Sequence, residues 1–219
     1  MKAEHFAGNR KRSALLASLC AVAVALVALS AVAFAEQPDI LSRDNVLRDP
    51  DIPDLGNPTG DLTVVEFFDY QCPYCKKLAP DLAKLVQEDG KIRLVLKDWP
   101  IFGDASVLAA KMALASKYQN KYAAAHDALI GANGKRTAAI INDLLAKAGV
   151  DVATAASDLQ AHEKSIDDLL ARNSDQADAF GFDGTPGFVV GTFRVPGVVE
   201  MKVFKMIVAD ARAAAKKKQ

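Results

Sequence analysis

Two cysteines separated by two residues, Cys72 and Cys75, stand at the junction of two different sequence patterns. The residues before them, 62–68, form a nearly continuous apolar run, which predicts a strand buried on both faces of a sheet. The residues after them, 76–88, place leucines and a valine at helical spacing and are followed by a glycine. Residues 92–96 predict a second strand. This order predicts a parallel βαβ unit with the cysteines at the strand-to-helix turn.

The first cysteine of the pair lies where the helix is expected to begin. Unpaired backbone N–H groups and the positive end of the helix dipole favour an anion at that place. Pro73 suits the first helical position because it has no N–H to satisfy. We therefore expect a Cys72 thiolate at neutral pH, exposed enough to react. Cys75, one turn further on, is predicted to be the shielded thiol that closes the disulfide or resolves a mixed disulfide.

Two other interpretations of the pair are a redox-inert local disulfide and half of a zinc site. A disulfide that closes so short a loop gains little stability, which favours a chemical role. Zinc would need two further ligands, and beyond the N-terminal segment only His126 and His162 are available. We expect neither a metal nor an organic cofactor, and we predict that His126 is a packed or half-exposed helix residue rather than a ligand.

The rest of the chain predicts a helical block followed by a second half with strands. Residues 36–60 contain four prolines and two glycines without an apolar period, which predicts an extended N-terminal arm. Residues 61–219 are expected to form one domain, with an α-helical insertion at about 103–180 where no strand signal occurs. Residues 188–195 predict a β-hairpin, and residues 201–215 an amphipathic helix. Trp99 is expected in core or lid packing, and the aromatic side chains expected in the core are Phe67, Phe68 and Phe102.

The N-terminus has the pattern of an export signal. Basic residues up to Arg12 precede an apolar run at 14–35, which ends in the small-residue sequence Ala33-Phe34-Ala35. We predict that residues 1–35 are a cleaved signal peptide and that the mature protein is periplasmic or secreted. Because the run is longer than a usual signal core, an uncleaved membrane anchor is the alternative. Cys20 lies inside this run and would be lost on cleavage.

Charge and cysteine content exclude two classes of function. The chain has 27 basic and 27 acidic residues, and removal of residues 1–35 leaves 23 against 26, so a nucleic acid partner is not expected. A secreted disulfide scaffold would have several cysteine pairs at longer spacings, whereas the predicted mature chain has one close pair. The composition therefore favours an exported protein whose cysteines perform chemistry.

One acidic residue interrupts the first predicted strand. Glu66 stands six residues before Cys72 among apolar neighbours, where an unpaired carboxylate would be costly. One interpretation is a proton acceptor near Cys75 with a pKa raised by desolvation. The other is a residue that reaches solvent or pairs with Arg93 on the neighbouring strand.

A proline also precedes the predicted hairpin. Pro186, in the sequence Gly184-Thr185-Pro186-Gly187, is unusual at the entry to a strand unless it lies at an edge or in a cis turn. An ordinary trans turn is what this sequence alone favours. In a fold that brought the loop to the cysteines, the backbone of Thr185 would be free to pair with an extended substrate segment.

The sequence Val65-Glu66-Phe67-Phe68-Asp69-Tyr70-Gln71-Cys72-Pro73-Tyr74-Cys75-Lys76, together with Gly184-Thr185-Pro186, closely resembles the DsbA family of exported thiol-disulfide oxidoreductases. Residues 54–61 look most like its ScsC, or copper-sensitivity suppressor, branch. The likeness covers roughly residues 50–215 and implies an α/β thioredoxin fold, in which the helical insertion separates a βαβ half from a β-hairpin-α half. It also implies the roles of site residues. These are the nucleophile Cys72, the resolving thiol Cys75, the buried acid Glu66, the cis-proline Pro186 after Thr185, and the substrate contacts Pro73, Tyr74 and Thr185.

This resemblance implies a thiol oxidase that acts on thiol-containing exported proteins and is recycled by a membrane redox partner. Tyr74 stands where the strongest oxidants have a histidine and supplies no imidazolium, so we expect a less oxidising pair. The enzymatic alternative is an isomerase, or a reductase kept reduced by a membrane partner. Isomerases of this superfamily carry a substantial N-terminal oligomerisation region, whereas about 25 residues precede the first predicted strand here, which argues against isomerase activity. We expect a monomer. A copper-binding or chaperone-like module is the alternative from another class.

Overall fold

A mixed β-sheet lies at the centre of the computed structural model, which describes residues 39–134 and 136–217. Within these residues, five strands are arranged in the order β1-β3-β2-β4-β5. The central strands β2 and β3 are parallel, and the other neighbouring pairs are antiparallel. The predicted signal peptide lies outside the described residues. The strands are β1 (Asp54–Gly56), β2 (Leu62–Phe68), β3 (Ile92–Asp98), β4 (Gly187–Val190) and β5 (Phe193–Pro196).

The predicted βαβ unit is confirmed. All seven side chains of β2 are buried, as the continuous apolar run predicted. Helix α3 (Pro73–Asp89) begins directly after Cys72 and ends at Gly90, which adopts the left-handed conformation (φ 66°) that a glycine tolerates without strain. The chain then enters β3 parallel to β2. The two cysteines therefore lie at the end of a buried central strand.

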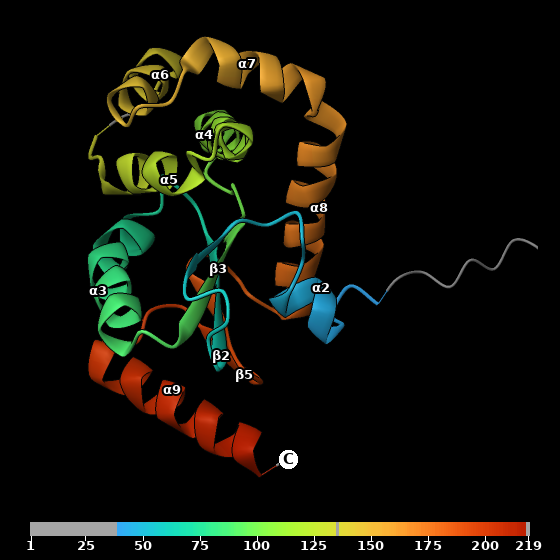
Figure 1. The fold of residues 1–219 in the computed structure, drawn as a ribbon, viewed down its shortest axis with the longest axis vertical. Coiled ribbons are helices and arrows are strands. Elements are labelled where there is room, and N and C mark those ends of the chain that lie inside the picture. The colour runs from blue at the N-terminus through green and yellow to red at the C-terminus, as the bar shows by residue number, and fades with distance from the viewer. Residues whose placement is uncertain (1–38, 135, 218–219) are drawn as a thin grey trace, which may run out of the picture. The chain divides into compact units, whose positions relative to one another are not determined.

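Helices cover both faces of the sheet (Figure 1). Helices α3 and α9 lie on one side, and α2 and α8 lie on the other. A helical block extends beyond the ends of β2 and β3 and separates the βαβ half from the hairpin and α9, as predicted. The helices other than α3 are α2 (Arg43–Leu47), α4 (Asp104–Ala115), α5 (Tyr122–Gly131), α6 (Ala138–Lys147), α7 (Val152–Ala161), α8 (Glu163–Ala179) and α9 (Met201–Lys216), with a 3₁₀ turn at Ser116–Gln119.

The segment before β2 differs from the extended arm that the sequence predicted. It contains the short helix α2 and the edge strand β1, which pairs with β3. The apolar residues Val46 and Leu47 are buried, and the Arg93 side chain donates hydrogen bonds to Asp54 and to the backbone carbonyl of Leu47. These contacts are long-range, so no local periodicity could predict them.

The aromatic core is largely the one predicted. Phe67, Phe68 and Trp99 are buried, but Phe102 is 49% exposed, so its predicted core position is wrong. The backbone N–H of Phe102 donates to the carboxylate of Asp69, which fixes the loop after β3. Because hydrogen bonds of the backbone set the path of this loop, the ring remains partly in solvent.

Candidate active site

Cys72 is the N-cap residue of α3, with an extended backbone conformation. Its sulfur accepts a hydrogen bond from the N–H of Cys75 over 3.3 Å, and as a thiol it donates to the carbonyl oxygen of Thr185 over 3.2 Å. Both cysteines are free thiols. The first sulfur therefore lies between the opening turn of a helix and a loop from the other half of the fold.

The loop beside the cysteines contains a cis peptide bond between Thr185 and Pro186. Strand β4 follows at once and pairs with β2, with Gly187 opposite Phe67. This pairing brings the loop to the end of β2, where the cysteines lie. A Cβ atom at Gly187 would be 2.8 Å from the ring of Phe182, so a glycine is needed for this close approach.

The environment of Cys72 stabilises its thiolate. The thiol of Cys75 donates a hydrogen bond to the Cys72 sulfur and makes the largest contribution to lowering its pKa, to about 6. Burial opposes this effect, while the Thr185 side chain and the N–H groups of Cys75 and Tyr74 add to it. The Thr185 hydroxyl is buried and has no hydrogen-bond partner among the described residues, so it can turn toward the sulfur.

The environment of Cys75 has the opposite effect. Its pKa is raised, first because its thiol donates to Cys72, and then by burial and by the negative charge that Glu66 carries when ionised. Because the pKa values of the two thiols shift in opposite directions, the thiolate is favoured at Cys72 and the protonated thiol at Cys75. The shifts are compatible with the nucleophile and resolving thiol that the sequence predicts, and these two roles stay predictions.

The exposure of Cys72 differs from the prediction. The residue is fully buried in the reduced form, whereas we expected an accessible sulfur. The Thr185 loop covers it, while Pro73 and Tyr74 beside it are exposed, Tyr74 by 63%. Because a thiolate has no proton to donate, ionisation of Cys72 removes the hydrogen bond from its sulfur to the Thr185 carbonyl, which is one of the contacts between this loop and the cysteine.

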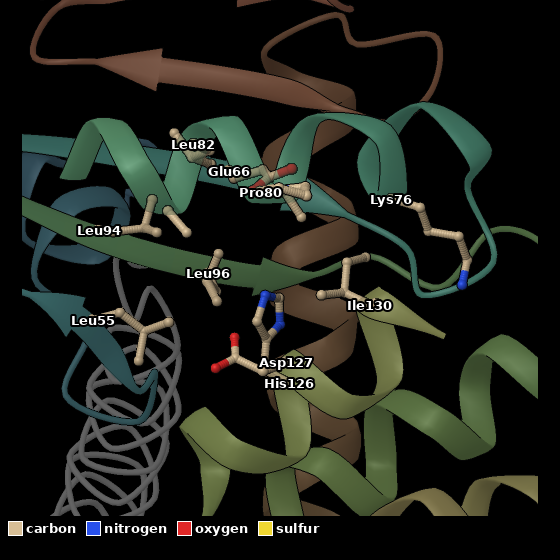
Figure 2. A pocket seen from close by; sticks show the side chains of 13 residues that line it. Leu55, Glu66, Lys76, Pro80, Leu82, Leu94, Leu96, His126, Asp127 and Ile130 are labelled. Carbon is tan, nitrogen blue, oxygen red and sulfur yellow. The ribbon is translucent and has the colours of Figure 1, made fainter. Parts of the chain in front are cut away.

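Glu66 lies on β2 with 4% of its surface exposed. It does not pair with Arg93, whose side chain donates to Asp54 instead, and it does not reach solvent at a strand end. Burial raises the pKa of Glu66 to about 8, and the Cys72 thiolate adds to the shift. It contributes to the lining of a cavity of about 190 Å³ between α3, β3 and α5, to which Lys76, His126 and Asp127 also contribute (Figure 2).

The substitution Glu66→Gln is expected to change how the stability of the reduced protein depends on pH. A carboxyl whose pKa is raised in the folded state stabilises the fold fully at pH values below its unfolded-state pKa of 4.5. This stabilisation is lost as the pH rises through the folded-state pKa of about 8. The variant has no such group, so relative to wild type it should gain about 5 kcal/mol in free energy of unfolding between these two pH values. Urea denaturation of both proteins across this range measures the gain. A constant difference between them would contradict the raised pKa.

His126 is packed in the core, as predicted. It is 7% exposed, and its ring lies among Phe68, Tyr70 and Tyr122, with the Tyr70 hydroxyl 3.3 Å from Nδ1. Desolvation lowers its pKa to about 4, so the ring is neutral. In residues 39–134 and 136–217, no group of three or more His, Cys, Asp or Glu side chains is placed to hold a metal ion.

Two residues next to the redox pair were not singled out by the sequence analysis. Lys76 follows Cys75 directly, lines the Glu66 cavity and donates to the carbonyl of Ala132. Desolvation lowers its pKa to about 8. Asp69 is fully hydrogen-bonded three residues before Cys72. Both lie within the conspicuous motif, but nothing in residue type or spacing shows which partners they have.

The fold, with its paired thiols at the start of α3, is that of the thioredoxin class of proteins. A match to the thioredoxin family spans residues 49–210. The chain belongs to that family.

Solved structures agree with this assignment. The thioredoxin-like oxidoreductase from Silicibacter pomeroyi is 42% identical, with a TM-score of 0.75 over 78% of this chain and 98% of that one. The thiol-disulfide exchange protein alpha-DsbA2 from Wolbachia pipientis is 28% identical (TM-score 0.72; 76% and 90% covered). The catalytic domain of ScsC from Proteus mirabilis is 25% identical (TM-score 0.69; 78% and 94% covered). These likenesses confirm the resemblance to the DsbA family and to ScsC.

Curated relatives include longer proteins. The chain is 27% identical over 168 residues to the Na(+)/H(+) antiporter NhaA 1 of Salinispora arenicola, covering 75% of this chain and 26% of the antiporter. The chain thus spans about a quarter of the length of that relative. In the described residues, none of the helices is both long and apolar enough to cross a membrane.

Proposed function

We propose that this protein is an exported thiol oxidase that transfers its Cys72–Cys75 disulfide to secreted or periplasmic proteins. The observation that carries the proposal is the contact set of the Cys72 sulfur, which lies at the start of α3 and faces Thr185. Hydrogen bonds to this sulfur from the Cys75 thiol and from the N–H groups of the first turn of α3 stabilise the thiolate, and therefore the reduced form of the pair. Stabilising the reduced form makes the disulfide easier to reduce, and hence a better oxidant of other thiols.

The proposed reaction moves two electrons from a substrate dithiol to the protein. A substrate thiolate attacks the Cys72 sulfur of the disulfide, the S–S bond breaks, and Cys75 leaves and takes up a proton, for which Glu66 is the proposed donor. The second substrate thiolate then attacks the substrate sulfur of the mixed disulfide. Cys72 leaves as its stabilised thiolate, and the substrate retains a new disulfide.

The surface beside Cys72 supports a polypeptide as the substrate. A groove of about 380 Å³ is lined by Tyr74, Leu78, Val198 and Met201, among others. Tyr74 and Val198 are exposed by 63% and 49%. We propose that Pro73, Tyr74 and the backbone of Thr185 contact an extended segment that carries the substrate cysteine.

The N-terminal pattern supports export, and we propose that cleavage after Ala35 releases the mature protein. Reoxidation of the Cys72–Cys75 pair requires an acceptor for two electrons. We propose a membrane-bound disulfide partner for this step, with the protein acting as a monomer.

The reduction potential of the Cys72–Cys75 pair tests the direction of exchange. We expect a value between the roughly −120 mV of DsbA and the about −270 mV of thioredoxin, because the thiolate is stabilised without an imidazolium from Tyr74. Equilibration with glutathione buffers, followed by mass spectrometry of trapped thiols, measures it. Oxidised protein should also form disulfides in reduced, unfolded RNase. A potential at or below that of thioredoxin would instead indicate a reductase.

A further inference from the structure

Asp69 lies between the end of β2 and the redox pair, with 1% of its surface exposed. Its carboxylate accepts four hydrogen bonds. Oδ1 accepts from the N–H of Gln71 (2.6 Å) and the hydroxyl of Ser106 (2.7 Å), and Oδ2 accepts from the N–H groups of Ile101 (2.7 Å) and Phe102 (3.0 Å). Its backbone carbonyl accepts from the N–H of Cys72 over 3.1 Å. Asp69 thus contacts both residues that lead into α3.

The arrangement around Asp69 is suited to a carboxylate rather than to a neutral side chain. A buried carboxylate is costly unless its oxygens are hydrogen-bonded, and here each oxygen accepts two bonds. Three of the four donors are backbone N–H groups, which cannot reverse their role. An amide at this position would turn an N–H₂ group toward at least one of these N–H donors.

Two of the four bonds, those from the N–H groups of Ile101 and Phe102, join two segments that are distant in sequence. One is the turn from Asp69 to Cys72, and the other is the loop after β3 that contains Ile101 and Phe102. The Gln71 side chain adds bonds to the Phe102 carbonyl (3.2 Å) and the Ser106 hydroxyl (3.0 Å). The loop therefore acts as a support for the backbone immediately before the nucleophile.

We propose that Asp69 is a positioning residue for the redox pair, whose carboxylate holds the backbone of Gln71 and Cys72 so that the N–H groups of the first turn of α3 point at the Cys72 sulfur. The inference rests on thiol exchange through Cys72. It assigns to Asp69 a role that requires its charge and shape but no contact with substrate.

The substitution Asp69→Asn tests this role. Ser106→Ala is the matched control, because it removes one donor from the same carboxylate, and one bond of the Gln71 side chain, but leaves the three backbone N–H bonds. In the asparagine variant, we expect the Cys72 pKa to be about one unit higher than in wild type. The alkylation rate of the reduced variant should then be roughly tenfold lower at pH values below the wild-type pKa. The alanine variant should retain the wild-type profile. Iodoacetamide alkylation across a pH series, read by mass spectrometry, measures all three proteins.

Hydrogen exchange of the wild-type protein gives a second test that does not depend on a variant folding. The amides of Gln71, Ile101 and Phe102 should be protected together. A folded asparagine variant with an unchanged Cys72 pKa, an equal shift in Ser106→Ala, or unprotected amides would each overturn the inference. None of these measurements uses a substrate, so failure of the proposed oxidase function, seen as wild-type protein that forms no disulfides in RNase, is a separate result.

Discussion

The substitution Cys72→Ser is expected to reduce thiol-disulfide exchange to the uncatalysed rate. The Cys72 sulfur is the atom that both attacks and is attacked, and serine has no comparable thiolate at neutral pH. No other described cysteine is placed to replace it, since Cys75 is fully buried, and burial and Glu66 still raise the pKa of its thiol when the Cys72 sulfur is absent. Dithiothreitol-driven reduction of insulin and oxidative refolding of RNase measure the loss.

The matched variant Cys75→Ser separates the two steps of the reaction. Cys72 can still form a mixed disulfide with a substrate, but no resolving thiol is present, so the adduct should accumulate. Non-reducing electrophoresis would show the adduct with Cys75→Ser and not with Cys72→Ser. Full activity of Cys72→Ser would exclude the assignment of this residue as nucleophile.

The reactivity of reduced Cys72 is expected to stay nearly constant above pH 6 and to fall about tenfold per pH unit below it. Only the thiolate reacts, and the contacts with Cys75, Thr185 and the first turn of α3 lower the pKa of Cys72 to about 6. An ordinary cysteine, with a pKa near 9, would lose reactivity throughout the neutral range. The alkylation rate and the ultraviolet absorbance of the thiolate, followed as functions of pH, give two independent titrations.

The same shift has a consequence for stability. A group with a depressed folded pKa contributes stability that is complete above its unfolded value and is lost as the pH falls through its folded value. The reduced protein should therefore lose stability relative to the oxidised protein as the pH falls from about 9 to about 6. Thermal melts of both forms test this. A titration midpoint near 9, together with equal pH dependence of the two forms, would show that the helix and the Thr185 loop do not stabilise the thiolate.

Several features were determined by local sequence alone. The continuous apolar run at 62–68, the Cys-Pro-Tyr-Cys turn and the helical spacing after it each act within a few residues, and the structure has the predicted strand, N-cap and helix there. Thr137 likewise caps α6, and its side-chain oxygen accepts from the N–H of Ile140 three residues on. In such segments, burial and capping depend on residues that are close in the sequence, so the spacing of apolar and capping residues predicts them.

Long-range contacts, in contrast, were decided only by the tertiary structure. The contact between Cys72 and Thr185 joins residues 113 positions apart, and the bond from Ile101 to Asp69 joins residues 32 apart. The burial of Glu66, the complete cover over Cys72 and the partial exposure of Phe102 follow from such contacts. A residue's type fixes which hydrogen bonds it can form, but its partner depends on how the sheet brings distant loops together. Local sequence therefore located the redox pair, while the packing of β2 against β3 and β4 determined what surrounds its sulfurs.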